Sequence, residues 1–328
     1  MKRITKISVC CKCRNQSEQR LNLEIKSEML NLEVAGMYLR NPIILASGFL
    51  GISQAIFERI YDEGAGAVVS KSISRYPMEG YRNPTIVVLE NKSYINAVGL
   101  SNPGCEAFSE EIKTNDKVPL MVSLVGSDPS DFEIMTRKLD GSGIIGFEIN
   151  LSCPHVQKLG LEVGDDPQMV KSIVETTKSN TSKPVFVKVG VGSTNILDIS
   201  QAALNAGADG ITAINTIRAM KISIDNFNPI LSNKVGGLSG PSIKPIAIRC
   251  VYELWKKFKV PIFGCGGVSN WEDAVEFMIA GAASFQVGTA IGFGGMSIFN
   301  SISNGIVKYM ERKGYQSVKE LIGRSHKY

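Results

Sequence analysis

Histidine is almost absent from this chain, which has only His155 and His326 among its 328 residues. Catalytic triads and most catalytic zinc sites use histidine as the base or as a ligand, so the sequence disfavours both. His326 lies close to the end of the chain, where we expect it to be exposed to solvent. Any chemistry therefore depends mainly on other residue types, and lysine, asparagine and cysteine are the candidates.

Long apolar runs are also missing. No segment approaches the length of a membrane span, and the start of the chain, Met1-Lys2-Arg3, is not followed by the apolar core of a signal peptide. The seven cysteines are odd in number and scattered, which is typical of reduced thiols in a cytoplasmic protein. Cys10, Cys11 and Cys13 lie close together, but no second Cys or His pair follows at zinc-site spacing, so we expect no metal site.

Charge of one sign does not accumulate anywhere. The formal net charge is +5, and basic and acidic residues are mixed along the chain, which does not favour a nucleic-acid-binding protein. Hydrophobic residues make up 44% of the chain, an ordinary value for a globular enzyme. Residues 1–29 are polar and poorly patterned, so we expect a poorly ordered N-terminal extension there, followed by a single domain over residues 30–328.

Short apolar strands alternate with helices and glycine turns from residue 43 onward. Uniformly apolar strands are typical of a parallel sheet that is covered on both faces. The pattern predicts the α/β class and a (β/α)8 TIM barrel, because eight such units can be counted. The rival fold is a doubly wound open sheet, which usually has a Gly-rich turn after its first strand, and this chain has none. The predicted strands start at Ile43, Ala67, Leu120, Gly146, Val185, Gly210, Pro261 and Ala283.

Three segments lie outside this repeat. Residues 30–40 alternate apolar and polar residues around Ala35-Gly36 and predict an N-terminal hairpin. Residues 74–106 contain two extended runs joined by Asn91-Lys92, which predict a hairpin insertion over the C-terminal mouth of the barrel. Residues 218–240 form another long connection. Long ordered insertions on this face of a barrel are usually functional.

Four polar residues, Lys71, Asn150, Lys188 and Asn215, each stand at the end of a predicted strand. The carboxyl ends of barrel strands meet at one face, so these side chains should converge. A single lysine there could extend to solvent, but two lysines and two asparagines indicate an anionic ligand rich in hydrogen-bonding groups. An asparagine amide offers both a donor and an acceptor, which matches an imide or pyrimidine edge.

The last two predicted strands end in Gly266-Gly267 and Gly288-Thr289. In barrels, the loops after strands seven and eight commonly bind phosphate through backbone N–H groups. The alternative is that both are ordinary tight turns. The pattern favours a phosphate-bearing ligand at this side of the mouth.

The fourth strand leads into Cys153-Pro154-His155, just after Asn150. Proline cannot continue a sheet ladder, so the strand ends and the thiol is placed on a loop at the mouth. Cys153 could be a base, a nucleophile or a small apolar residue. His155 could tune the thiol, contact a substrate or cap the loop.

Four motifs together resemble class 1 dihydroorotate dehydrogenases from about Leu30 to the last barrel helix, and most closely the 1B subgroup. The motifs are Asn96-Ala97-Val98-Gly99-Leu100, Asn150-Leu151-Ser152-Cys153-Pro154, Gly236-Gly237-Leu238-Ser239-Gly240-Pro241 and Gly264-Cys265-Gly266-Gly267-Val268. The resemblance implies oxidation of (S)-dihydroorotate to orotate, a step of pyrimidine (UMP) biosynthesis, with FMN as cofactor. It also implies a homodimer core joined to a subunit that carries FAD and a 2Fe-2S cluster and reduces NAD. The fumarate-linked 1A subgroup is the alternative.

The resemblance also implies roles for individual residues. Cys153 would be the catalytic base that takes the C5 proton of dihydroorotate, and Lys188 would lie near the pyrimidine end of the flavin. FMN would be held by Ser47, Lys71, Ser72, Asn150, Lys188, Ile214, Gly240, Gly266, Gly267, Gly288 and Thr289. The substrate would be held by Lys71, Asn96, Ala97, Val98, Gly99, Leu100, Asn150, Asn215 and Thr216.

Two residues depart from the family pattern. His155 stands where the family usually has Asn, and Ser123 stands where many 1B members have Asn at the end of the third strand. The first bears on the substrate and the second on the flavin, so a dihydropyrimidine-type dehydrogenase stays open. From the residues themselves, an isomerase or aldolase that uses Lys71 or Lys188 as a Schiff-base lysine also stays open, as does a non-catalytic subunit.

Overall fold

The barrel is closed by parallel strands that follow one another in chain order. The computed structural model describes residues 28–141, 143–151, 163–192 and 194–327, so most of the predicted extension lies outside it. Neighbouring strands pair in parallel register, and the last pairs with the first. The predicted (β/α)8 barrel is confirmed. Its strands are β3 (Ile43–Leu45), β4 (Ala67–Val69), β7 (Leu120–Leu124), β8 (Gly146–Asn150), β9 (Val185–Val189), β10 (Gly210–Ala213), β15 (Ile262–Cys265) and β16 (Ser284–Val287).

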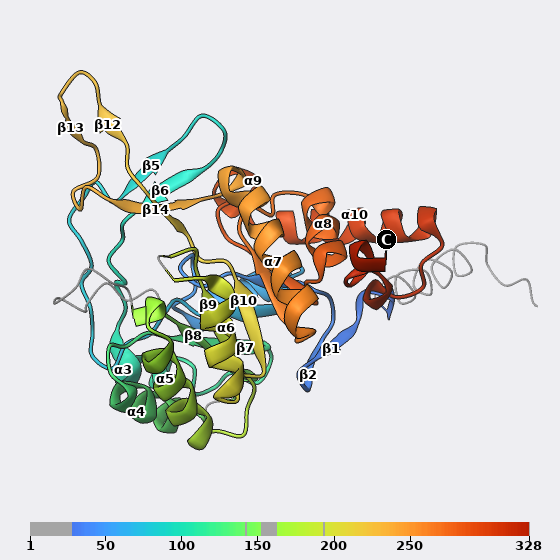
Figure 1. Cartoon of the computed structure of the whole chain (residues 1–328), viewed down its shortest axis with the longest axis horizontal. Coiled ribbons are helices and arrows are strands. Elements are labelled where there is room, and N and C mark those ends of the chain that lie inside the picture. The colour runs from blue at the N-terminus through green and yellow to red at the C-terminus, as the bar shows by residue number, and fades with distance from the viewer. Residues whose placement is uncertain (1–27, 142, 152–162, 193, 328) are drawn as a thin grey trace, which may run out of the picture.

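Helices surround the barrel and bury the outer faces of its strands (Figure 1). Several begin at an Asp or Asn whose side chain accepts a backbone N–H of the first turn, as at Asp128, Asp166 and Asn270. The α-helices are α2 (Gln54–Asp62), α3 (Gly104–Glu111), α4 (Pro129–Leu139), α5 (Pro167–Ser179), α6 (Ile196–Asn205), α7 (Lys244–Phe258), α8 (Trp271–Ala280), α9 (Ile291–Gly294) and α10 (Ile298–Lys313). Short 3-10 turns are η1 (Val163–Asp165), η2 (Pro241–Ile243), η3 (Val318–Leu321) and η4 (Arg324–Lys327).

The N-terminal hairpin lies at the end of the barrel opposite the mouth (Figure 1). Strands β1 (Leu32–Val34) and β2 (Met37–Leu39) pair antiparallel around the Ala35-Gly36 turn, as predicted. Their inward side chains are buried, and a side chain added at Gly146, where β8 begins, would come within 3.4 Å of Met37 Sδ. The hairpin therefore packs under the barrel, and the opposite end is left for ligands.

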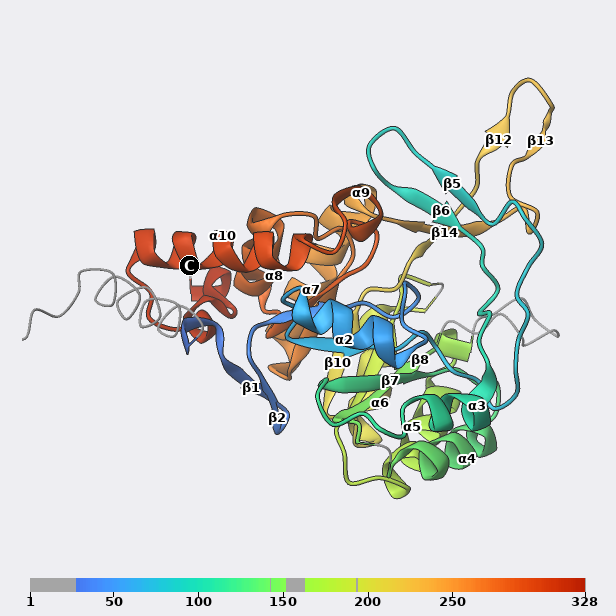
Figure 2. The ribbon, with the colours of Figure 1, turned by 180° about the vertical axis from the view of Figure 1, so that it is seen from behind.

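A second sheet covers the mouth (Figure 2). The predicted hairpin forms from β5 (Ile86–Val88) and β6 (Tyr94–Asn96), and this prediction is confirmed. The connection over residues 218–240 joins it, because β14 (Gly236–Ser239) pairs with β6 and β11 (Ile217–Ala219) pairs with β14. Beyond them, β12 (Ile222–Ser223) and β13 (Asn228–Pro229) form a projecting hairpin. Two insertions that are far apart in sequence thus make one roof.

Side-chain contacts fasten this roof to the barrel. The backbone N–H of Ser242 donates to Ser93 Oγ at 3.1 Å, and Asn91 Nδ2 donates to Ser242 Oγ at 2.6 Å. The ring of Tyr94 stacks on Phe293 with the centroids 5.0 Å apart. The position of the roof over the barrel is therefore set by contacts with the segments that follow β14 and β16.

His326 is half-buried, so the prediction that it is solvent-exposed was wrong. Its ring stacks on Tyr252 with the centroids 3.8 Å apart, and its Nε2 lies 2.9 Å from the carbonyl oxygen of Ala280. The physical reason is that η4 packs against α8, which removes part of the His326 side chain from solvent. Position near a terminus did not predict exposure here.

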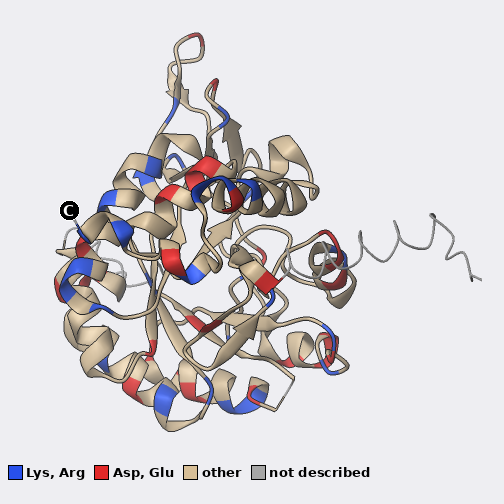
Figure 3. Cartoon of the chain, turned by 90° about the vertical axis from the view of Figure 1, so that its right-hand side faces the viewer, with Lys and Arg blue, Asp and Glu red and all other residues tan. Residues whose placement is uncertain are grey.

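Lys and Arg residues are interspersed among Asp and Glu residues over the outer elements (Figure 3). This agrees with the mixed charge pattern of the sequence. Of the helices that the structure describes, none is both long enough and apolar enough to cross a membrane.

Candidate functional site

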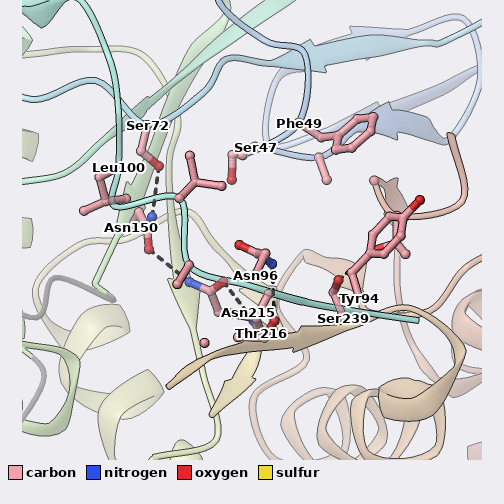
Figure 4. A pocket seen from close by; sticks show the side chains of 18 of the residues that line it. Ser47, Phe49, Ser72, Tyr94, Asn96, Leu100, Asn150, Asn215, Thr216 and Ser239 are labelled. Atoms are coloured by element: carbon pink, nitrogen blue, oxygen red, sulfur yellow. Dashed lines mark hydrogen bonds between the residues drawn. The ribbon is translucent and has the colours of Figure 1, made fainter. Parts of the chain in front are cut away.

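A cavity of about 620 Å³ lies between the carboxyl ends of the barrel strands and the roof (Figure 4). This volume is typical of a site for a small molecule or cofactor. Every residue that was predicted to bind the cofactor or the substrate lines this cavity. The structure therefore brings together segments from residue 47 to residue 289. Cys153 and His155 lie outside the described residues.

Lys188 lies in the floor of the cavity and is almost completely buried. Its Nζ donates to Ser47 Oγ at 3.0 Å and to Gln286 Oε1 at 3.1 Å, and it lies 3.6 Å from Glu148 Oε1. Burial by itself would lower the pKa of this ammonium, but Cys265 and Glu148 outweigh it and hold the pKa above the ordinary lysine value. The floor of the cavity thus presents a fixed positive charge.

Lys71 differs from Lys188 in having no counter-ion among the residues that the structure describes. It follows β4, lines the cavity and is half-buried. Among the described residues, no carboxylate or carbonyl meets its ammonium. Burial lowers the pKa of Lys71 below the ordinary lysine value. A bound anion would pair with this cation and compensate for its partial desolvation, so the site is suited to a carboxylate or phosphate.

A chain of hydrogen bonds orders the polar side chains at the mouth (Figure 4). Asn150 Nδ2 donates to Ser72 Oγ at 2.9 Å, and Ser72 Oγ lies 2.9 Å from Ser123 Oγ. Asn215 Nδ2 donates to Asn150 Oδ1 at 3.1 Å. Ser123 is fully buried and supports Ser72, and it is not one of the residues that line the cavity. Ser123 therefore contributes to the site indirectly, through its hydrogen bond to Ser72.

Glycines form the opposite wall. Gly240 and Gly267 both have φ +92°, a conformation that side-chain-bearing residues rarely adopt. A Cβ at Gly267 would lie 2.7 Å from Lys244 Cβ and 2.9 Å from the carbonyl oxygen of Gly240, so there is no room for one. Within the described chain, the N–H groups of Gly267, Gly288 and Thr289 have no acceptor. These three donors beside the cavity suit an anionic oxygen group.

Several cavity residues were not recognised in the sequence. Gln286 lies within a mostly apolar strand and resembles an ordinary strand residue, and Cys265 was noted only as part of a glycine motif. Burial raises the pKa of the Cys265 thiol. Tyr94 and Phe49 come from the roof and from the loop after β3 (Figure 4). The signal that could have found Gln286 was the two-residue alternation of its strand, which places it inside the barrel two positions before Gly288.

Nothing in the described part of the chain resembles a metal centre, since no group of three or more His, Cys, Asp or Glu side chains is close enough to hold an ion. The fold and the cavity together define a TIM-barrel protein with a roofed, cation-bearing site at the carboxyl ends of its strands.

Comparison with known proteins identifies the family. Residues 29–310 match the family model described as dihydroorotate dehydrogenase, and the chain belongs to this family. A curated protein of Pyrococcus furiosus, named dihydroorotate dehydrogenase B (NAD(+)), catalytic subunit, is 47% identical over 299 residues, which cover 91% of this chain and 99% of that protein. Proteins with the same name from Pyrococcus abyssi and Methanothermobacter thermautotrophicus are 47% and 43% identical, over 90% and 91% of this chain and 98% and 99% of those proteins.

Proposed function

We propose that this chain is the catalytic subunit of an NAD-linked dihydroorotate dehydrogenase, and that residues 30–328 form a single catalytic domain that binds FMN. The observation that carries the proposal is the convergence of Lys71, Lys188, Asn150 and Asn215 on one cavity in a chain of this family. The names of the similar proteins support the NAD-linked subgroup over the fumarate-linked one.

The cavity residues fit a flavin mononucleotide. The N–H groups of Gly267, Gly288 and Thr289, which have no acceptor within the described chain, would hold its phosphate. Lys188 would face the pyrimidine end of the ring, where a fixed cation favours the negative charge that the ring gains on reduction. The remaining contacts would come from Ser47, Lys71, Ser72, Asn150, Ile214 and Gly266, all in the cavity wall.

Lys71 favours a substrate that carries a carboxylate. Its ammonium faces the cavity without a counter-ion among the described residues, and dihydroorotate has a carboxylate that an unsubstituted dihydropyrimidine lacks. The amides of Asn150 and Asn215, together with Asn96 and Thr216, would pair with the imide edge of the substrate ring. Residues 97–100 would complete the wall beside it.

The reaction removes a proton from C5 of dihydroorotate and a hydride from C6, which leaves the double bond of orotate. We propose Cys153 as the base that takes the C5 proton, in keeping with the family resemblance of its motif. A free thiol has a pKa of about 8.5, so modest help is enough to make it a base. A bound flavin would accept the hydride, and the chain would orient the substrate through Lys71 and the asparagine amides.

A Schiff-base role fits Lys188 poorly. A nucleophilic lysine must be neutral, whereas Lys188 has its pKa held above the ordinary value. Family membership likewise argues against an isomerase or aldolase that uses Lys71.

Anaerobic titration tests the proposal. Purified protein should be yellow, and its flavin absorbance should bleach on addition of dihydroorotate and return on addition of an electron acceptor. Dihydrouracil, which has the same ring without the carboxylate, serves as the matched control and should bleach the flavin much more slowly. A flavin that stays oxidised with dihydroorotate would contradict the proposal, and bleaching by dihydrouracil alone would indicate a dihydropyrimidine dehydrogenase.

We also propose a cytoplasmic homodimer that joins an electron-transfer subunit carrying FAD and a 2Fe-2S cluster. The name "catalytic subunit" of the similar proteins supports a further subunit. The β12–β13 hairpin projects from the roof and exposes Ile224 at 83% and Phe227 at 89% of their surface. Apolar side chains this exposed are commonly buried by another subunit, and we assign this surface to a second copy of the chain.

A further inference from the structure

Glu148 is a buried carboxylate to which the proposed chemistry gives no role. It lies in the middle of β8, two residues before Asn150, and none of its surface is exposed. Residues two apart on a strand face the same side, so Glu148 lies in the barrel interior one layer beneath Asn150. It is not among the residues that line the cavity. A charged group in this position requires a physical explanation, because burying an unpaired carboxylate is costly.

Two of the three side chains that donate hydrogen bonds to Glu148 line the cavity. Its Oε1 accepts a hydrogen bond from Ser47 Oγ at 2.9 Å, and its Oε2 accepts from Gln286 Nε2 at 2.6 Å and from Thr212 Oγ1 at 3.0 Å. Ser47 and Gln286 also receive the hydrogen bonds of Lys188, at 3.0 Å and 3.1 Å. Each of them therefore bridges the carboxylate and the ammonium, and both line the cavity together with Lys188.

These bridges fix the orientation of the groups in the floor. The Gln286 amide can serve both partners in only one orientation, with its nitrogen toward Glu148 and its oxygen toward Lys188. The Ser47 hydroxyl donates to Glu148 and so presents a lone pair to Lys188. With Glu148 as the acceptor beneath, Lys188 is held at 3.6 Å from its counter-ion and at a set position in the floor.

We infer that Glu148 is a positioning residue that keeps Lys188 protonated and in place beneath the flavin in both oxidation states, so that reduction of the flavin draws no proton onto this lysine. The inference rests on the proposed flavin site. Its physical basis is that an ammonium buried without a counter-ion loses its proton readily, and buried lysines of that kind titrate as low as roughly pH 5–6.

Among the described residues, the titratable groups that bear on Lys188 are Glu148 from β8 and Cys265 from β15. Cys265 raises the pKa of Lys188 only when it is a thiolate. Burial raises the pKa of the Cys265 thiol itself, so at neutral pH it is uncharged and cannot replace the carboxylate. Without the charge of Glu148, Lys188 would be neutral beside the oxidised flavin and would take up a proton when the flavin gains negative charge. The proton would come from solvent, and reduction by two electrons would then consume one proton more than in the unaltered protein.

The test is the slope of the flavin midpoint potential against pH, with dithionite as the reductant and no dihydroorotate present. For a two-electron couple, each proton taken up adds the same increment to this slope. If the unaltered protein takes up one proton per two electrons, Glu148→Gln should double the slope. Glu148→Asp keeps a negative charge and should restore the original slope. In the double variant Glu148→Gln, Lys188→Met the slope should return to its original value. This result would assign the additional proton to Lys188.

Glu33→Gln is the matched control, because Glu33 is exposed on β1 at the far end of the barrel, and it should leave the slope unchanged.

A Glu148→Gln protein that binds flavin with the original slope would overturn the inference. If that variant does not fold, the unaltered protein decides: since Lys188 remains protonated, its slope should not increase with rising pH up to about pH 9. An increase of slope below that pH would overturn the inference. Dithionite reduces the flavin directly, so this experiment does not depend on dihydroorotate. If dihydroorotate fails to reduce the flavin, that result counts against the proposed reaction and not against the role of Glu148. A protein that binds no flavin would remove both proposals.

Discussion

Asn215 donates its side-chain N–H to the Oδ1 of Asn150 across 3.1 Å, although 65 residues separate them in the chain. Asn150 in turn donates to Ser72, so the orientation of both amides is determined by the protein before any ligand binds. A planar ring with alternating donors and acceptors could therefore bind to the amides of Asn150 and Asn215 without any change in their orientation. Preorganisation of this kind lowers the entropy lost on binding.

Replacing Asn215 by Ala should weaken substrate binding and leave the flavin in place. The variant loses one donor to the ligand and the bond that orients Asn150, and leaving a buried polar group without its partner costs about 1–3 kcal/mol. We expect the KM for dihydroorotate to rise roughly 10- to 100-fold. Steady-state kinetics measure this, with Asn205→Ala on the exposed end of α6 as the control. An unchanged KM would show that Asn215 does not contact the substrate.

Lys71→Met should impair binding of the substrate carboxylate. A hydrogen bond to a charged group contributes about 1.5–3 kcal/mol, so the affinity for orotate should fall roughly 10- to 100-fold. Orotate binding can be followed through the change it causes in the flavin spectrum. Lys308→Met, on the exposed side of α10, removes a lysine far from the cavity and should have no effect.

The affinity for orotate should also depend on pH through Lys71. Burial lowers the pKa of Lys71 in the free protein, and a bound carboxylate favours the ammonium and raises it again. Orotate therefore binds most tightly below the pKa of the free protein and progressively less tightly as the pH rises through it. This loss should begin at lower pH than the ordinary lysine value of about 10.4 predicts. It should be absent from Lys71→Met, and persistence of the same profile in that variant would assign it to another group.

Gly267→Ala should both destabilise the protein and weaken flavin binding. Its φ of +92° is strained for alanine, and the new Cβ would lie 2.7 Å from Lys244 Cβ. Strain of this kind costs about 1–3 kcal/mol. Urea denaturation and flavin titration measure the two effects. Gly141→Ala is the control, because a side chain there meets no atom within 4 Å and its backbone is not in the left-handed region.

Cys153→Ala should retain flavin and lose most of the rate of flavin reduction by dihydroorotate. Loss of a positioned base typically slows the chemical step roughly 100-fold or more. Stopped-flow absorbance under anaerobic conditions measures this step directly. Cys13→Ala removes a thiol from the N-terminal segment and should react normally. If Cys153→Ala reduces its flavin at the original rate, the base is another residue.

Polar substitutions on the projecting hairpin should separate the proposed homodimer. Ile224→Thr with Phe227→Asn removes two of the most exposed apolar side chains, and asparagine tolerates the positive φ of +56° at position 227. Light scattering after gel filtration should show a shift from dimer to monomer. Tyr38→Ser is the control, because it also removes a large exposed side chain, from β2, and it should leave the mass unchanged. A double variant that stays dimeric would place the interface elsewhere.

The sequence by itself determined the barrel and most of the cavity wall. Parallel strands that are covered on both faces are mostly apolar, so a run such as Ile43–Leu45 can be recognised in the sequence, and polar residues near the strand ends stand out. Because such strands all point the same way, knowing that Lys71 and Asn215 end two of them was enough to place both at the mouth.

Only the tertiary structure decided how these groups act on one another. Gln286 and Glu148 lie within buried strands, and local sequence gives no measure of which polar atoms meet across a barrel. The same limit applies to the roof, where β14 pairs with β6 although more than a hundred residues separate them. Within the described chain, Lys188 has a counter-ion and Lys71 has none. This difference depends on distances between strands that are remote in the chain, and electrostatic energies follow those distances.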